Sequence, residues 1–301
     1  MLNSGALSLT PSAAAGGVWY GGRGMAMGAY ASNVIDYITI ATTSNATDFG
    51  NLLGTGGRNS AMSNGSRAVA AYNGSLDYVT IASTGNAVSF GTYSVSATAA
   101  HDSGHSSSVR GLWARPNNNS DNTIDYITIS TTSNSTDFGD LTVGRSATAA
   151  TGSNERCLFA GGNSPSGMSN VIDYVTIATT GNATDFGNMT ISQMHRGGCS
   201  NNTRAIIAGG DNGGPSSNVI EYVTISTTGN GTDFGDLSPS VQTSAASNGT
   251  SDRGVFLGGY EYPGAGNVNN IQYITISTTS NSTDFGDLTT ARYGTGGCSG
   301  D

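Results

Sequence analysis

The sequence contains no lysine. All eleven basic residues are arginines, set against twenty acidic residues, and the formal net charge is −9. No stretch of ten residues holds more than two of these arginines. Because proteins that bind nucleic acids usually present a clustered basic surface to the phosphates, we expect no nucleic-acid partner. The acidic surface is expected to favour solubility.

Long hydrophobic segments are also missing. Residues 1–17 have no basic start and no apolar run long enough for a signal peptide or a membrane helix. We therefore expect neither export by the usual secretory route nor insertion into a membrane. Charged residues make up only 10% of the chain, apolar residues make up 36%, and 45 of the 301 residues are glycine. Short apolar strands joined by polar turns have this composition, which predicts an all-β protein.

A repeat runs through the chain. A tyrosine followed by Ile or Val precedes a Thr-Ile pair six times, at Tyr37, Tyr78, Tyr126, Tyr174, Tyr222 and Tyr273. The tyrosines are 41, 48, 48, 48 and 51 residues apart, a period typical of solenoids and propellers. The sequence has no helical periodicity, which excludes the helical repeats. Disordered low-complexity chains lack such recurring apolar runs, so we expect an ordered protein.

Each repeat unit predicts four short strands. The first is rich in small residues, as at 145–151 and 196–200, which suits the crowded position around a central channel. The second covers 204–210 in one unit and ends in Gly-Gly. The third, at 171–178, is apolar on both faces and is expected to be covered on both. A Thr-Gly-Asn or Thr-Ser-Asn hairpin then leads into the fourth.

The fourth strand carries Asp-Phe-Gly, or Ser-Phe-Gly in the second unit. Because the motif recurs, it indicates a structural role and not the single kinase motif. We expect the Asp side chains to accept local backbone N–H groups and the Phe side chains to fill the gaps between blades. The phenylalanines are Phe49, Phe90, Phe138, Phe186, Phe234 and Phe285.

The two ends of the chain complete one unit. Residues 17–22 (GVWYGG) are predicted as a second strand without a first, and residues 290–299 align with 192–200 and then stop. The sequence therefore predicts an all-β, six-bladed β-propeller of four-stranded antiparallel blades, closed when the C-terminal strand pairs with the N-terminal blade. Residues 1–301 form one domain in this prediction, and 287–301 complete the blade begun by 14–50.

The three cysteines are an odd number. Cys199 and Cys298 occupy the same place in units two blades apart, which is farther than the ~7 Å that a disulfide tolerates. All three cysteines are expected to be small buried residues.

An apolar strand ending in Gly-Gly, then a tyrosine, then an aromatic residue resembles the Kelch family of propellers. Phe186, Phe234 and Phe285 stand where a Kelch repeat usually has tryptophan. The phrase at 173–186 (DYVTIATTGNATDF) is similar to repeats in virion structural proteins of marine tailed bacteriophages. This resemblance covers nearly the whole chain from about Val34. It implies a virion appendage or decoration protein that assembles in the host cytoplasm, and it identifies no functional residues.

Five arginines share one repeat position, at the start of the second strand: Arg67, Arg110, Arg156, Arg204 and Arg253. They predict either a ring that binds an anion or a structural set. In the structural interpretation, which the periodicity favours, each bonds carboxylates or carbonyls of its own or a neighbouring blade, with Asp36, Asp77, Asp125, Asp173 and Glu221 as partners.

Candidate chemistry is sparse. His101 and His105 flank Asp102 in a serine-rich connection that favours a solvated loop over a metal site. The repeated Asn-x-Thr sequons are expected to serve the hairpin and to carry no glycan. We therefore expect no metal and no cofactor. Two functions stay open. The favoured one is a non-enzymatic virion protein that contacts other virion proteins and a host-surface glycan or receptor. The alternative is a glycan hydrolase or lyase, which needs paired carboxylates in the central funnel.

The connections between second and third strands vary most between units, so they are the expected binding surface. Tyr260, Glu261 and Tyr262 are the first candidates, because aromatic side chains beside a carboxylate can stack on sugars or anchor a protein. The same loops in other units add three more candidate binding residues, Arg23, Tyr30 and Arg115.

Overall fold

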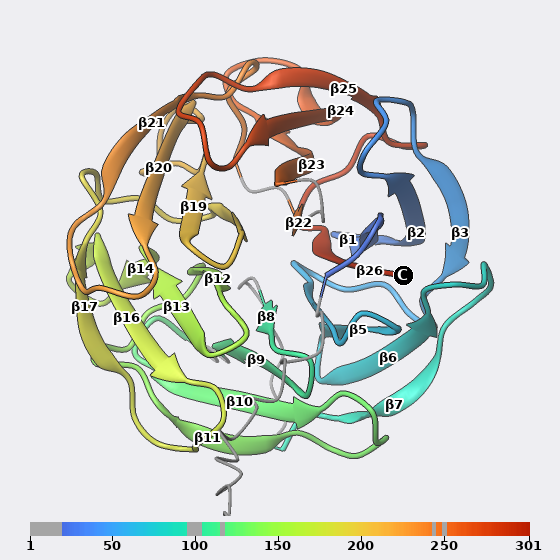
Figure 1. Cartoon of the computed structure of the whole chain (residues 1–301), viewed down its shortest axis with the longest axis horizontal. Coiled ribbons are helices and arrows are strands. Elements are labelled where there is room, and N and C mark those ends of the chain that lie inside the picture. The colour runs from blue at the N-terminus through green and yellow to red at the C-terminus, as the bar shows by residue number, and fades with distance from the viewer. Residues whose placement is uncertain (1–19, 95–103, 115–117, 243–244, 249–251) are drawn as a thin grey trace, which may run out of the picture.

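The computed structural model describes residues 20–94, 104–114, 118–242, 245–248 and 252–301. These residues form six four-stranded antiparallel sheets arranged as the blades of a propeller (Figure 1), and a two-stranded hairpin extends one blade. No helix occurs in this part of the chain. The predicted all-β fold, blade number and strand number per blade are confirmed.

Every blade runs from an inner strand at the axis to an outer strand at the rim. In blades one to three the strands, from the inside outwards, are β26 (Gly296–Gly300), β1 (Arg23–Ala29), β2 (Ser32–Thr39) and β3 (Thr47–Asn51); β4 (Ser60–Ser63), β5 (Arg67–Tyr72), β6 (Ser75–Thr80) and β7 (Val88–Thr92); and β8 (Gly104–Ser106), β9 (Arg110–Ala114), β10 (Thr123–Thr128) and β11 (Thr136–Asp140).

Blades four to six follow the same order. Their strands are β12 (Ala149–Gly152), β13 (Arg156–Ala160), β16 (Val171–Thr176) and β17 (Thr184–Asn188); β18 (Gly197–Ser200), β19 (Arg204–Ala208), β20 (Val219–Thr224) and β21 (Thr232–Asp236); and β22 (Ala245–Asn248), β23 (Arg253–Glu261), β24 (Gly266–Thr275) and β25 (Thr283–Asp287). The hairpin of β14 (Asn163–Ser164) and β15 (Gly167–Met168) extends blade four.

Six apolar clusters hold the ring together, and each lies between two consecutive blades. Phe186 of blade four, for example, packs with Ala205 and Ile207 of blade five. The same ring meets Tyr174 of its own blade edge to face at 5.8 Å, and every blade repeats this pair. The prediction that the phenylalanines fill the gaps between blades is confirmed.

Ring closure is also confirmed. Strand β26 pairs antiparallel with β1, opposing Cys298 to Met25, and in Figure 1 the red C-terminal strand lies beside the dark blue β1. The predicted start of the partner strand was wrong, because β1 covers Arg23–Ala29 and residues 20–22 precede it; residues 17–19 of the predicted strand lie outside the described residues. Gly21 and Gly22 instead lie against the last residues of the chain, where a Cβ on Gly21 would fall 2.2 Å from the Gly300 carbonyl carbon.

The inner strands begin later than the sequence predicts. The strand predicted over residues 145–151 starts at Ala149, and the one predicted over 196–200 starts at Gly197. The preceding residues, Arg145 and Arg196 among them, belong to the connections that lead in from the previous blade. All three cysteines are buried, as predicted, and none forms a disulfide; burial raises the pKa of the Cys298 thiol to about 12.

The antiparallel order gives the ring two different faces. The connections between second and third strands, and those leading to the next blade, emerge on one face, which we call the loop face. The connections between first and second strands, and between third and fourth strands, emerge on the opposite face, which we call the turn face. On the loop face the two kinds of connection are joined by backbone bridges, such as Met194 with Asp211 and Gln242 with Tyr260.

Candidate functional site

The repeated arginines on the turn face join neighbouring blades. Arg156 lies over the Tyr174 ring of its own blade at 4.8 Å, and its Nη1 donates to the Ile225 carbonyl of the next blade at 2.9 Å. Arg67, Arg110, Arg204 and Arg253 make the corresponding pair of contacts. Arg23 completes the set with the Tyr37 ring and the Ile81 carbonyl.

Arg23 therefore lies at the start of a strand on the turn face, and not in a loop on the binding surface as its sequence position suggested. It also approaches Asp301, with 3.7 Å between Nε and Oδ2. The guanidinium face of each of the six arginines lies over a tyrosine, and its donors bond the next blade. These contacts favour the structural interpretation of the arginines over a ring that binds an anion.

The predicted acidic partners of these arginines lie elsewhere. Arg204 pairs across the sheet with Thr224, three residues beyond Glu221 and hence about 10 Å from it along the strand. Glu221 and its equivalents are buried near the loop face. Asp36, Asp77, Asp173 and Glu221 each accept a backbone N–H from the connection that enters their blade, as Glu221 does from Thr190 at 2.6 Å and Asp36 from Thr289 at 3.1 Å. Asp125 accepts the Ser94 hydroxyl of that connection at 3.2 Å.

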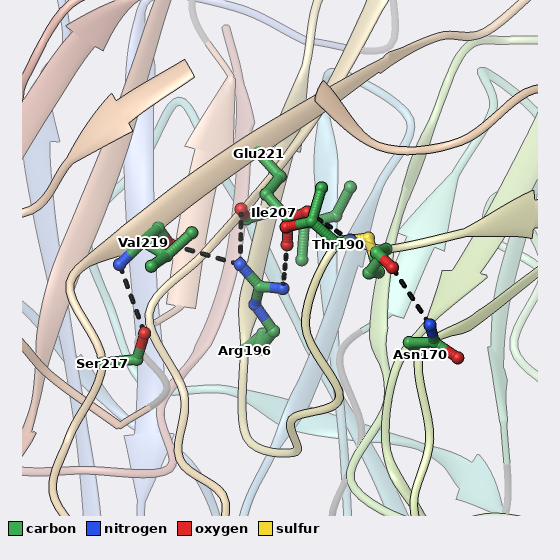
Figure 2. Close-up of polar contacts among 8 residues, drawn as sticks. Asn170, Thr190, Arg196, Ile207, Ser217, Val219 and Glu221 are labelled. Atoms are coloured by element: carbon green, nitrogen blue, oxygen red, sulfur yellow. Dashed lines mark hydrogen bonds and ion pairs between the residues drawn. The ribbon is translucent and has the colours of Figure 1, made fainter. Parts of the chain in front are cut away.

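A second group of arginines, which the sequence analysis placed in strands, supplies the charge for three of these acids. The buried pairs are Arg145 with Asp173, Arg196 with Glu221 and Arg292 with Asp36. In Figure 2 the Arg196 guanidinium is enclosed by Glu221 and by the carbonyls of Ile207 and Val219. Burial lowers the pKa of Arg196, and the charge and hydrogen bond of Glu221 oppose that shift.

The asparagine of each outer hairpin also links blades. Asn182 Oδ1 accepts the Asp140 N–H of the preceding blade at 3.1 Å, and the other five units repeat this bond. The sequons therefore recur because this contact needs an asparagine, a more specific reason than the turn conformation that the sequence suggested. The glycine of Asp-Phe-Gly fits under the same hairpin. A Cβ on Gly139 would lie 2.4 Å from the Gly181 carbonyl oxygen.

The repeated side chains thus make contacts that join neighbouring blades. The exposed side chains that differ between blades lie mainly on the loop face. Of the six large apolar side chains that are exposed among the described residues, four belong to loop-face connections: Tyr30, Leu53, Val143 and Tyr262. Among the arginines that the structure describes, Arg58 alone belongs to neither of the two structural sets, and it too lies in a loop-face connection.

Three tyrosines from distant parts of the chain meet at the joint between blades six and one. Tyr30 stacks on Tyr293 with 5.3 Å between ring centroids, and Tyr260 meets the same Tyr293 ring at 5.6 Å. The Arg58 guanidinium lies 5.4 Å from the centre of the Tyr293 ring. We call Tyr30, Tyr260 and Tyr293 the tyrosine platform. The structure therefore brings two of the predicted binding residues, Tyr30 and Tyr260, to one place.

The other predicted binding residues are distributed differently. Tyr262 is 52% exposed, and its backbone is held by Ser216 of blade five, whose N–H donates to the Tyr262 carbonyl at 2.6 Å. Glu261 lies between the two tyrosines, in the turn end of the long hairpin. Arg115 lies outside the described residues.

Sequence reasoning missed Tyr293, Arg58 and a third feature, the pair of His195 and Asp211. His195 Nδ1 lies 2.7 Å from Asp211 Oδ2. Burial lowers the pKa of His195, and so does the positive charge of Arg58, while Asp211 opposes the shift. Burial by itself would raise the pKa of Asp211, but hydrogen bonds from His195 and Gly213 and the charge of Arg58 hold it below its usual value.

An alignment of the six repeat units with one another contains the signal for several of these residues. Tyr30, Asp211 and Tyr260 each come at the residue that follows the glycine-rich end of a second strand. Met194 and Gln242, the bridge partners of Asp211 and Tyr260, come three residues before an inner strand, and so does Tyr293, whose carbonyl accepts the Tyr30 N–H. Comparing these two positions across units would have shown that they meet.

The channel at the axis is lined by small side chains. Its cavity has a volume of about 20 Å³, roughly the space for one water molecule, and the lining includes Ser63, Ser106, Gly198 and His105. His105 is buried, donates to the Ser153 carbonyl, and burial lowers its pKa to about 4. The described lining residues include no carboxylate, so the paired acids that glycan hydrolysis needs are not found among them. His101, which the sequence analysis considered together with His105 as a metal site, lies outside the described residues.

Comparisons with known proteins add no family. No protein-family model matches the chain, and a search of curated proteins finds no match. The Kelch-like and bacteriophage resemblances therefore stay predictions from the sequence. Within the part of the chain that the structure describes, no helix is long and apolar enough to cross a membrane. No cluster of three or more His, Cys, Asp or Glu side chains suited to a metal occurs in that part either.

Proposed function

We propose that the chain is a non-enzymatic binding module, a structural or appendage protein of a virion that presents its loop face to a neighbouring virion protein or to the host surface. One observation carries the binding part of this proposal: the side chains that repeat in every blade and the side chains that do not repeat have different roles. Repeated Arg, Tyr, Phe and Asn side chains join the blades, whereas Tyr30 and Tyr262, which do not repeat, are exposed on the loop face. The virion part rests on the resemblance of the repeat phrase.

The virion assignment can be tested on purified particles from the source of this sequence. Mass spectrometry should detect the chain in stoichiometric amounts, and a cryo-EM map should contain six-bladed density on the capsid or tail surface. Absence of the chain from gradient-purified particles would contradict the virion assignment.

The orientation can be tested in the same particles. Tyr260→Ala combined with Tyr262→Ala should weaken binding to host cells or to the neighbouring protein, with the melting temperature unchanged. A matched control is Val109→Ala, which alters a side chain on the turn face whose exposure of 56% is close to the 52% of Tyr262. If the control weakens binding and the tyrosine variant does not, the binding surface is the turn face.

A further inference from the structure

The tyrosine platform has the properties of a preformed ligand surface. Its three rings come from the loop of blade one, the hairpin of blade six and the connection between those blades. Tyr30 is 57% exposed although one of its faces is stacked on Tyr293. The other face of the Tyr30 ring is therefore open to solvent.

The backbone under the platform is fixed. The Tyr30 N–H donates to the Tyr293 carbonyl at 3.0 Å, and the Ala31 N–H donates to the Gly56 carbonyl at 3.1 Å. Tyr260 exchanges two backbone hydrogen bonds with Gln242. A ligand that stacks on these rings would not have to order them first, which removes one of the usual entropic costs of binding.

We propose that the tyrosine platform binds a neutral oligosaccharide by stacking one pyranose ring on the open face of Tyr30. This inference rests on the proposed function, because it takes the loop face to be the binding face, and it names the class of ligand. The C–H groups on one face of a pyranose carry a small positive charge, and the face of an aromatic ring is negative, so the two surfaces attract each other.

The surroundings favour a sugar over a protein partner. A protein interface needs about 800 Å² on each partner with an apolar centre, and Tyr30 is the one member of the platform among the large apolar side chains that are exposed in the described residues. Polar groups that suit hydroxyl groups lie on the same face: Ser216 donates to the Tyr260 carbonyl at 3.0 Å, and Asp211 pairs with His195 in the neighbouring blade. A small aromatic surface next to fixed polar groups matches a saccharide better than an extended protein surface.

The charges favour a neutral sugar. Arg58 beside Tyr293 is the one cation in contact with a platform ring among the described residues, whereas Asp211 and Glu261, the residue after Tyr260, are carboxylates on the same face. The whole chain carries a net charge of −9. A uronic or sialic acid would be attracted by one group and repelled by the two others, whereas a neutral sugar meets no such opposition.

Binding of the full-length chain to an array of immobilised neutral and acidic oligosaccharides tests the proposal, with calorimetry on the positive sugars. We expect binding to neutral pyranose sugars that Tyr30→Ala weakens at least tenfold and that Tyr30→Phe, which keeps the ring, weakens less than about threefold. Val143→Ala is the matched control, because Val143 is also exposed on the loop face but lies in the connection between blades three and four. All three variants should keep the melting temperature of the wild type.

Three outcomes would overturn the inference: no neutral sugar bound at millimolar concentration, binding that Tyr30→Ala leaves intact, or binding confined to acidic sugars and abolished by 0.5 M salt. Failure here is distinct from failure of the proposed function. A chain found in virions that binds no neutral sugar refutes the platform alone. A chain that binds neutral sugars but is absent from virions refutes the virion role alone.

Discussion

The buried pair of Arg196 and Glu221 offers the sharpest test of how the blades are joined. Arg196 is 1% exposed and Glu221 is fully buried, and 2.6 Å separates Nη1 from Oε2. Arg196→Met keeps a long apolar side chain in the same space but leaves the carboxylate without its cation. Breaking a buried pair by removing one partner costs about 3–5 kcal/mol, and we expect the free energy of unfolding to fall by that amount.

A second substitution separates the lost charge from the lost packing. Blade six has Gln272 at the position of Glu221, and this amide is satisfied without arginine, because it accepts from the Ser238 N–H and donates to the Pro239 carbonyl. Adding Glu221→Gln to Arg196→Met should therefore restore stability to within about 1–2 kcal/mol of the wild type.

The measurement is a double-mutant cycle from urea unfolding followed by circular dichroism, with Gln272→Glu as the converse variant. Gln272→Glu places a buried carboxylate where no arginine ion pair is found and should be destabilising. If the double variant is as unstable as Arg196→Met, the unpaired carboxylate is not the cause. The loss would then lie in the bonds from Arg196 to the carbonyls of Ile207 and Val219.

Contacts elsewhere in the ring set four more expectations. Arg204→Ala should lower the unfolding free energy by about 1–3 kcal/mol in urea titration and leave ligand binding unchanged, and lost binding at full stability would contradict its structural role. Gly50→Ala, whose Cβ would lie 2.3 Å from the Gly85 oxygen, should cost at least about 2 kcal/mol, while Gly85→Ala, with nothing within 4 Å, should leave the melting temperature unchanged. Deleting residues 290–301 should expose the edge of β1 and cause aggregation, so a monomeric product with an unchanged melting temperature would refute the closure. Between about pH 6.5 and pH 4 the unfolded chain protonates His105 and the folded chain does not, so stability should fall by about 3 kcal/mol as the pH drops, and His105→Gln should remove that part of the fall.

The fold could be predicted because each level of the sequence pointed the same way. One tyrosine and one phenylalanine per unit fixed the number of blades, and the incomplete units at the two ends fixed the closure. The start of β1 was misplaced because residues 17–22 also end in Gly-Gly. A comparison of Arg23 with Arg67 and Arg253, which all begin second strands, would have corrected it.

The site was harder to predict because pairing depends on position along the strand as well as on charge. The sequence offered Glu221 and its equivalents as partners for Arg204 and its equivalents, one of each in nearly every unit. The register separates the two sets by about 10 Å, and in three blades an arginine from the incoming connection pairs with the acid instead. Arg145 and Arg292 stand four residues before their inner strands and Arg196 stands one residue before its own, so no single repeat position revealed this group.

The position of the tyrosine platform follows from how the ring closes. Tyr30 and Tyr260 are 230 residues apart in the sequence, and they share Tyr293 because the chain returns to blade one at its end. The closing joint uses the same contacts as the other joints: Asn45 accepts from the Asp287 N–H, and Asp36 accepts from the Thr289 N–H. Since this joint is built like the other five, the loops above it are held as firmly as those elsewhere. The aromatic surface therefore arises where two non-repeating ends meet on a repeating scaffold, and there the chain can vary its side chains without disturbing the contacts that join the blades.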